Sequence, residues 1–99
     1  MTETSINYAK ALYELSVPEE AVLETEKIFR STPQLKGTLE NPLVSLKEKE
    51  HVIDRVFPQE MKNFLKVTCK YQKISSIEEI LEAYGDYSRK QKGILKAVL

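Results

Sequence analysis

The sequence predicts an all-α protein, a six-helix bundle with a short extended segment at its C-terminal end. Residues that favour helix starts recur at short intervals, and the apolar residues between them repeat with a helical period. The composition is 41% hydrophobic and 30% charged, which is typical of a small globular domain. We therefore expect a single domain with one core, because 99 residues cannot build two.

The first three helices are expected in the N-terminal 40 residues. We expect the first helix from about Ser5 to Leu15. Ser16, followed three residues later by Glu19, has the pattern of a capping box and predicts the start of the second helix. Thr32 before Pro33 predicts a short third helix, because proline is favoured in the first turn.

Similar signals predict three further helices. Ser45 with Glu48 and Ser76 with Glu79 repeat the capping box, and Pro58 can open the helix between them. After Gly93 the sequence ends in a mostly apolar run without a cap, Ile94-Leu95-Lys96-Ala97-Val98-Leu99. We interpret this run as an extended segment that needs a partner or as the start of material that is missing, and we favour the second interpretation.

Two of the expected helices carry more apolar surface than one packing contact covers. In the first helix three polar residues share one side, so apolar side chains occupy roughly 220° of the circumference. In residues 61–71 the same arrangement leaves roughly 200°. The polar residues are Asn7, Lys10 and Glu14 in the first helix, and Asn63, Lys66 and Lys70 in the other. A helix that is central in the bundle would also be apolar all round, so a binding role remains one of two interpretations.

The charge balance and the cysteine count exclude several classes of protein. Fifteen basic and fifteen acidic residues give a net charge of zero, which argues against a broad phosphate-binding surface. A single cysteine, Cys69, allows no internal disulfide and favours a reducing compartment such as the cytosol. Apolar runs are far shorter than the ~20 residues that span a bilayer, so we expect no direct membrane insertion.

The sequence contains no familiar catalytic, cofactor or metal motif, and we expect none of these sites. Glycine-rich phosphate loops, paired cysteines and HExxH are absent. His51 is predicted to be a solvated surface residue and Cys69 a small packing residue. We therefore expect a protein that is not an enzyme.

One local excess of positive charge keeps a second function open. It consists of Arg89, Lys90, Lys92 and Lys96. A solvated helix end, where cations suit the helix dipole, explains these residues better than a phosphate site does. A small helical RNA- or DNA-binding module is nevertheless the alternative function.

Three stretches in the same order resemble the delta subunit of F-type ATP synthases, the relative of the mitochondrial oligomycin-sensitivity-conferring protein. Residues 8–13, Tyr-Ala-Lys-Ala-Leu-Tyr, are similar to the family's opening helix. Residues 41–53, which begin Asn-Pro-Leu-Val-Ser and continue through Lys-Glu-Lys to Val-Ile, resemble its NPxVSxxEKxxVI segment. Residues 63–67, Asn-Phe-Leu-Lys-Val, then Ile80, Tyr84 and the end from Gly93 to Val98 resemble the third. The chain departs from the family at residues 70–73, Lys-Tyr-Gln-Lys, where Glu-Asn and Arg are frequent.

The resemblance implies a stator component without cofactors. Residues 1–92 would be the N-terminal helical domain that binds the catalytic head, and residues 93–99 the start of a linker to a missing C-terminal domain. That missing domain would meet the b-subunit stalk. The complex would place the chain peripherally on the cytoplasmic side of the cell membrane.

The resemblance also implies a binding groove for the N-terminal helix of an alpha subunit, between the first and fifth helices. Those are the two helices with surplus apolar surface, which suits helix-in-groove recognition. Which face of each helix lines the groove is our own prediction. The candidate partner-binding residues are Tyr8, Ala9, Ala11, Leu12, Leu15, Phe64, Thr68 and Tyr71.

Overall fold

The structure, a computed structural model, describes the backbone of residues 2–98 and the side chains of residues 2–91. Within this part it contains six α-helices, one short 3-10 turn and no strand, as the sequence predicts. The elements are α1 (Glu3–Glu14), α2 (Glu19–Ser31), α3 (Pro33–Glu40), α4 (Leu46–Val56), α5 (Gln59–Lys70), η1 (Ile74–Ser76) and α6 (Ile77–Val98).

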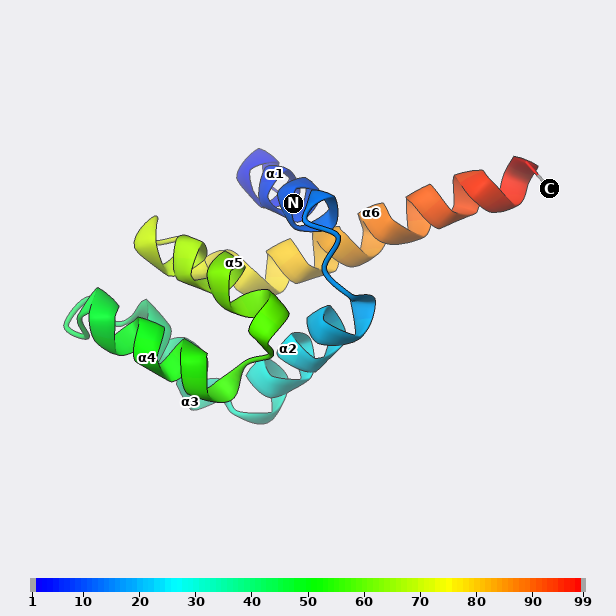
Figure 1. Cartoon of the computed structure of the whole chain (residues 1–99). Helices are drawn as coiled ribbons and strands as arrows, with labels where there is room; N and C mark the ends of the chain where they lie inside the picture. Colours follow the sequence, from blue (N-terminus) through cyan, green and yellow to red (C-terminus); the bar gives the residue numbers. More distant parts are fainter. Residues whose placement is uncertain (1, 99) are drawn as a thin grey trace.

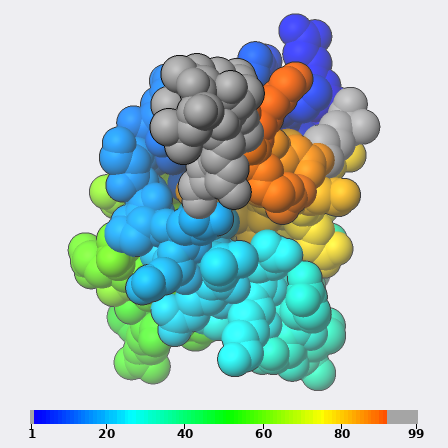
Figure 2. All heavy atoms as spheres, turned by 90° about the vertical axis from the view of Figure 1, so that its right-hand side faces the viewer, coloured from blue at the N-terminus to red at the C-terminus, as the bar shows by residue number. Residues whose placement is uncertain are grey.

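The helices form two packed pairs, which α2 connects (Figure 1). α1 lies along α6, α4 lies along α5, and α2 contacts α3, α5 and α6. Figure 2 shows α2 and α3 forming the lower half of one face, below α6. The C-terminal turns of α6 extend beyond the other helices in Figure 1, so the molecule measures 51 × 25 × 22 Å.

One continuous core joins all six helices. The aromatic rings of Phe29 in α2 and Phe57 after α4 lie 5.0 Å apart at their centroids. The largest fully buried apolar side chains are Leu12, Leu39, Ile53, Met61, Leu65, Ile77 and Ile80. These residues come from α1, α3, α4, α5 and α6, and Phe29 comes from α2. Displacing any one of the six helices would therefore expose part of the core to water.

The predicted helix starts are confirmed in part. The hydroxyl of Ser45 caps α4 by accepting a hydrogen bond from the amide of Glu48 at 3.2 Å. Thr32 and Pro33 open α3, as expected. Ser16 does not cap α2: its φ is 57°, so it ends α1 in the left-handed region, and Pro18 stands at the cap of α2. A capping side chain needs extended backbone, which Ser16 lacks.

The start of α6 differs from the predicted capping box. Ser76 belongs to the 3-10 turn that leads directly into α6. The carboxylate of Glu79 accepts hydrogen bonds from Thr2 and Ser5. Thr2 is also the true cap of α1, because its hydroxyl accepts from the Ser5 amide at 3.2 Å. Tertiary contact with α1 has therefore replaced the local contact predicted for Glu79.

The predicted extended segment at the C-terminal end is wrong for the residues that the structure describes. α6 continues through Gly93 to Val98 as one helix of 22 residues. Glycine costs only ~1 kcal/mol inside a helix, and Leu, Lys and Ala, which follow Gly93, are good helix formers. The boundary predicted after residue 92 thus falls inside α6, and the division into domain and linker stays a prediction. Leu99 and the side chains after Gln91 lie outside the described part.

Candidate docking surface between α1 and α5

One flank of α1 faces α5, and Tyr8 marks it. The ring of Tyr8 is half-buried and meets the ring of Phe64 edge to face, with 6.3 Å between the centroids. The opposite flank faces α6, where Tyr13 contacts the ring of Tyr87 at 5.1 Å. Between the two flanks, Leu12 is fully buried in the core. The apolar residues of α1 therefore fall into three groups: a buried stripe in the core, a flank beside α5 and a flank beside α6.

Three residues form a row along the flank of α1 that faces α5. They are Tyr8, Ala11 and Leu15, and the spacing of three and four residues places them above one another on the helix. Ala11 is exposed, and Leu15 is 60% exposed just after the helix ends. We call these residues the α1 row.

α5 has a matching row on the flank that faces α1. Its other side packs against α4, where the Lys66 ammonium lies 2.8 Å from the Asp54 carboxylate and lowers the pKa of that carboxyl. On the flank away from α4, the same spacing of three and four residues places three side chains in line. We call them the α5 row: Phe64, which is buried, Val67, which is 43% exposed, and Tyr71, which is 57% exposed.

The two rows meet at the pair of Tyr8 and Phe64. The backbones of α1 and α5 stay mostly apart, because α1 packs chiefly on α6 and α5 packs on α4. The ring pair therefore joins the two helices, and the exposed members of both rows extend from it. We call the two rows together the strip: its centre is the pair of half-buried Tyr8 and buried Phe64, and its other side chains are exposed.

The structure divides the eight predicted partner-binding residues into two sets. Tyr8, Ala11, Leu15 and Tyr71 lie in the strip. Ala9, Leu12 and Thr68 belong to the core, and Phe64 is the buried member of the strip. The Thr68 hydroxyl donates to the Leu65 carbonyl oxygen at 2.7 Å, so its polar group is satisfied within α5.

Sequence reasoning missed one exposed member of the strip, Val67. It lies three residues after Phe64 and four before Tyr71, and this spacing on one flank is the signal that could have found it. The prediction instead counted Val67 only as part of a wide apolar arc. A wide arc does not say which part of it the rest of the bundle covers.

The N-terminal end of α1 is held by a polar clasp, defined as Thr2, Ser5 and Glu79. The Glu79 carboxylate in α6 accepts from the Thr2 hydroxyl at 3.1 Å, from the Thr2 amide at 3.3 Å and from the Ser5 hydroxyl. These hydrogen bonds, that from Ser5 above all, lower the pKa of Glu79. The clasp fixes the start of α1 on α6 and so helps to set the position of the α1 row.

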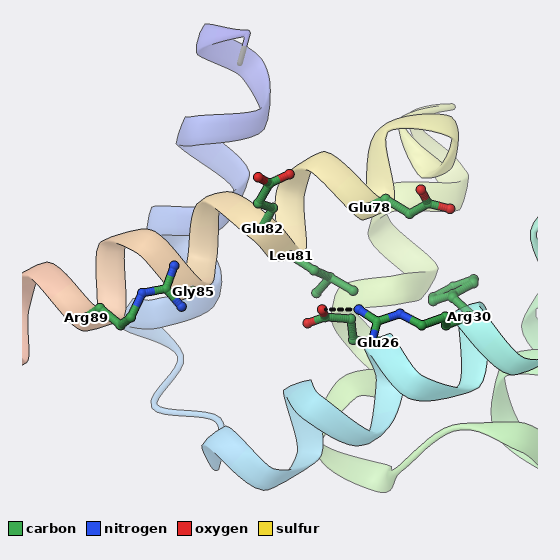
Figure 3. Close-up of a pocket in the computed structure, with 8 residues that line it drawn as sticks. Glu26, Arg30, Glu78, Leu81, Glu82, Gly85 and Arg89 are labelled. Atoms are coloured by element: carbon green, nitrogen blue, oxygen red, sulfur yellow. Dashed lines mark hydrogen bonds and ion pairs between the residues drawn. The ribbon is translucent and has the colours of Figure 1, made fainter.

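A second concave region lies between α2 and α6, and its charges are largely paired. This hollow of about 390 Å³ has Phe29 and Leu81 among its lining residues. Figure 3 shows Arg30 pointing toward Glu26, with 2.9 Å between guanidinium and carboxylate, and Glu82 pointing away from them. Because both of its arginines pair with a carboxylate on their own helix, Arg30 with Glu26 and Arg89 with Asp86, the hollow offers an anion little free charge.

The residues singled out for chemistry lie apart from one another. His51 is exposed on α4, as predicted. Cys69 is buried, and burial raises the pKa of its thiol to about 11. Among the described side chains, no group of three or more His, Cys, Asp or Glu residues is placed to hold a metal ion.

The predicted basic cluster is only partly within the described side chains. Arg89 pairs with Asp86 one turn earlier on α6, while Lys90 is exposed. The side chains of Lys92 and Lys96 lie outside the described part. Along the described chain, no helix combines the length and the apolar character that a bilayer crossing needs.

Comparison with known proteins gives a consistent result. The family described as ATP synthase delta (OSCP) subunit matches residues 5–99. The ATP synthase subunit delta of Clostridioides difficile (strain 630) is 31% identical over 103 residues, which cover 92% of this chain and 57% of the relative.

Two further bacterial relatives give similar figures. The ATP synthase subunit delta of Carboxydothermus hydrogenoformans is 27% identical over 87% of this chain and 54% of its own length. The corresponding subunit of Prochlorococcus marinus (strain MIT 9301) is 26% identical over 93% of this chain and 57% of its own length. The chain thus spans about half the length of the curated relatives it matches. No solved structure matches it.

Proposed function

This chain belongs to the ATP synthase delta (OSCP) family, and from that membership we propose that it is a stator component that binds the catalytic head of an F-type ATP synthase. Its binding site is the apolar strip formed by the α1 row and the α5 row. Its ligand is the N-terminal helix of an alpha subunit. The strip does no catalysis, and its role is to hold the head in place.

The observation that supports this proposal is the exposure of apolar side chains on two helices that the Tyr8–Phe64 ring pair joins. Leu15, Val67 and Tyr71 are 43–60% exposed, although each stands on a flank next to the core. An amphipathic helix that presents apolar residues every three or four positions would cover both rows at once. Burial of this apolar surface would supply most of the affinity, because exposed ion pairs contribute less than ~1 kcal/mol each.

The mechanical role follows from where such a contact acts. A rotor turns inside the head, and the head would turn with it unless a static element held it. A docked alpha helix would connect the head to this chain, so that rotation is used for ATP synthesis. The connection to the membrane would run through the b-subunit stalk, on the cytoplasmic side.

Calorimetric titration of the chain with a peptide of the alpha N-terminal helix tests the proposal. We expect one saturable site for the unaltered chain. Val67→Glu places a charge in the middle of the strip and should weaken binding at least tenfold. Leu43→Glu is the matched control, because Leu43 is 92% exposed in the loop before α4 and lies outside both rows.

The outcomes separate clearly. Binding that is weakened by Val67→Glu and unchanged by Leu43→Glu supports docking on the strip. No saturable binding up to high micromolar peptide contradicts the proposal. Equal affinity of both variants and the unaltered chain places the helix elsewhere and contradicts the assigned surface.

A further inference from the structure

The segment of residues 41–53 contributes two residues to the lining of a small cavity that lies outside the strip. Pro42, near its start, and Lys49, in α4, both line this cavity of about 310 Å³. The remaining lining residues come from the end of α3, the end of α5 and the region of η1. They are Leu39, Glu40, Cys69, Gln72, Ile74 and Ser75.

Lys49 is an unusual residue in this cavity because most of its side chain is buried although it carries a charge. Only 9% of its surface is exposed, whereas Lys47 on the same helix is exposed. Within the described side chains, the Lys49 ammonium makes neither an ion pair nor a hydrogen bond. No buried side-chain nitrogen or oxygen of the described residues lacks a hydrogen-bond partner, so the unpaired ammonium reaches solvent, where an anion in the cavity would form a charge-assisted hydrogen bond with it.

The neighbouring groups do not supply that anion. The Glu40 carboxylate pairs with Lys36, at 3.6 Å. Burial raises the pKa of the Cys69 thiol to about 11, although the nearby Lys49 charge acts in the opposite direction. Cys69 is therefore a neutral thiol at neutral pH. The Glu50 carboxylate is close enough to Cys69 to raise the pKa of its thiol. Its negative charge would also repel an anion that enters the cavity.

The other polar groups of the cavity suit an oxyanion. Gln72 carries an amide and Ser75 a hydroxyl, and both groups can donate hydrogen bonds to oxygen. Apolar side chains, Leu39 and Ile74, are also among the lining residues. A charged ammonium with neutral donors in a partly apolar cavity is the environment in which charge-assisted hydrogen bonds are strongest.

We propose that this cavity binds a small oxyanion, a carboxylate or a phosphate group, with Lys49 as its counter-charge. The proposal does not depend on the docking of an alpha helix, because none of the cavity residues belongs to the strip. A carboxylate would come from an acidic side chain or a chain end, and a phosphate from the free ion or an ester.

Titration of the ¹⁵N-labelled chain with sodium phosphate and, separately, with sodium acetate tests this proposal, with sodium chloride keeping the ionic strength constant. We expect saturable amide shifts at Lys49, Gln72, Ile74 and Ser75 with at least one of the two anions. Lys49→Met keeps the aliphatic stem and should weaken that binding at least tenfold. Lys47→Met removes a charge from the exposed face of the same helix and should leave the binding unchanged.

The phosphate and acetate titrations distinguish the two sources of the oxyanion. A response to one anion alone assigns that chemistry. Shifts that do not saturate, or that are equal in Lys49→Met, overturn the proposal. Equal loss in both variants indicates an adventitious surface ion only, which also overturns it.

Urea unfolding without added anion provides an independent readout. Because Lys49 is unpaired, Lys49→Met should keep the unfolding midpoint or raise it. A clearly lower midpoint would mean that contacts within the protein already use the Lys49 charge, and this result would contradict the proposal.

Discussion

Two leucines three residues apart, Leu12 in α1 and Leu15 just after it, provide a test of how the structure divides core from docking surface. Leu12 is fully buried and Leu15 is 60% exposed. Leu12→Ala leaves a cavity in the core and should lower the free energy of unfolding by ~3 kcal/mol. For a chain of this size that corresponds to a thermal midpoint about 10–25 °C lower.

Leu15→Ala should leave the stability of the fold nearly unchanged and weaken the binding of the alpha peptide. The change in unfolding free energy should stay within ~0.5 kcal/mol, because the side chain is largely in water. Full burial of a leucine is worth ~1.5–3 kcal/mol, and the 60% that is still exposed corresponds to about 1–2 kcal/mol on docking. Binding of the alpha peptide should therefore weaken about 5- to 30-fold.

Urea unfolding and calorimetric titration of both variants measure these effects. The comparison is well matched because both substitutions remove the same atoms, three residues apart in the chain. The reasoning is refuted if Leu15→Ala destabilises the fold as much as Leu12→Ala does. Unchanged peptide affinity in a stably folded Leu15→Ala variant would refute the assignment of this flank.

Two further predictions concern titratable groups. The lowered pKa of Glu79 means that its clasp stabilises the fold above the unfolded value near 4.5 and loses this effect as pH falls through the folded value. Glu79→Gln should therefore lower the urea midpoint at pH 7 and converge with the unaltered chain in acid; a constant difference would contradict the clasp. Burial raises the pKa of Cys69 to about 11, so iodoacetamide at pH 8 should modify the native thiol about 100-fold more slowly than the unfolded one. Equal rates, measured by mass spectrometry, would contradict this prediction.

The helical fold could be predicted because it depends on local signals. Ser45 and Pro33 act through the backbone of their own turns, and these start signals are confirmed. Ser16 and Glu79 also have the local pattern of a cap, yet tertiary structure uses them differently. Ser16 ends α1 in a left-handed conformation, and Glu79 bonds to α1, 74 and 77 residues away in sequence.

The end of α6 shows that a short apolar run does not identify the secondary structure of a segment. An apolar run of a few residues fits a strand and a buried helix equally well. Here the helix that precedes residues 93–98 continues through them, because neither a proline nor a cap stops it after Gly93. The sequence pattern alone could not distinguish these outcomes.

The candidate site was predictable as a pair of helices and not as a set of side chains. The wide apolar arcs correctly drew attention to α1 and α5, but periodicity does not say which neighbour covers which flank. Leu12 and Leu15 lie in the same arc, and only the packing of α1 on α6 separates them. For the same reason the sequence did not identify the exposed Val67 as a binding residue, and it favoured the buried Thr68.

Mapping the alpha peptide onto the ¹⁵N-labelled chain tests the central claim most directly. The account predicts saturable amide shifts that concentrate on the α1 row and the α5 row, at Ala11, Leu15, Val67 and Tyr71. The exposed apolar residues Leu23 and Val56, which line a separate hollow beside α2 and α4, should not respond. Shifts that concentrate at that hollow, or that fail to saturate anywhere, would contradict docking between α1 and α5.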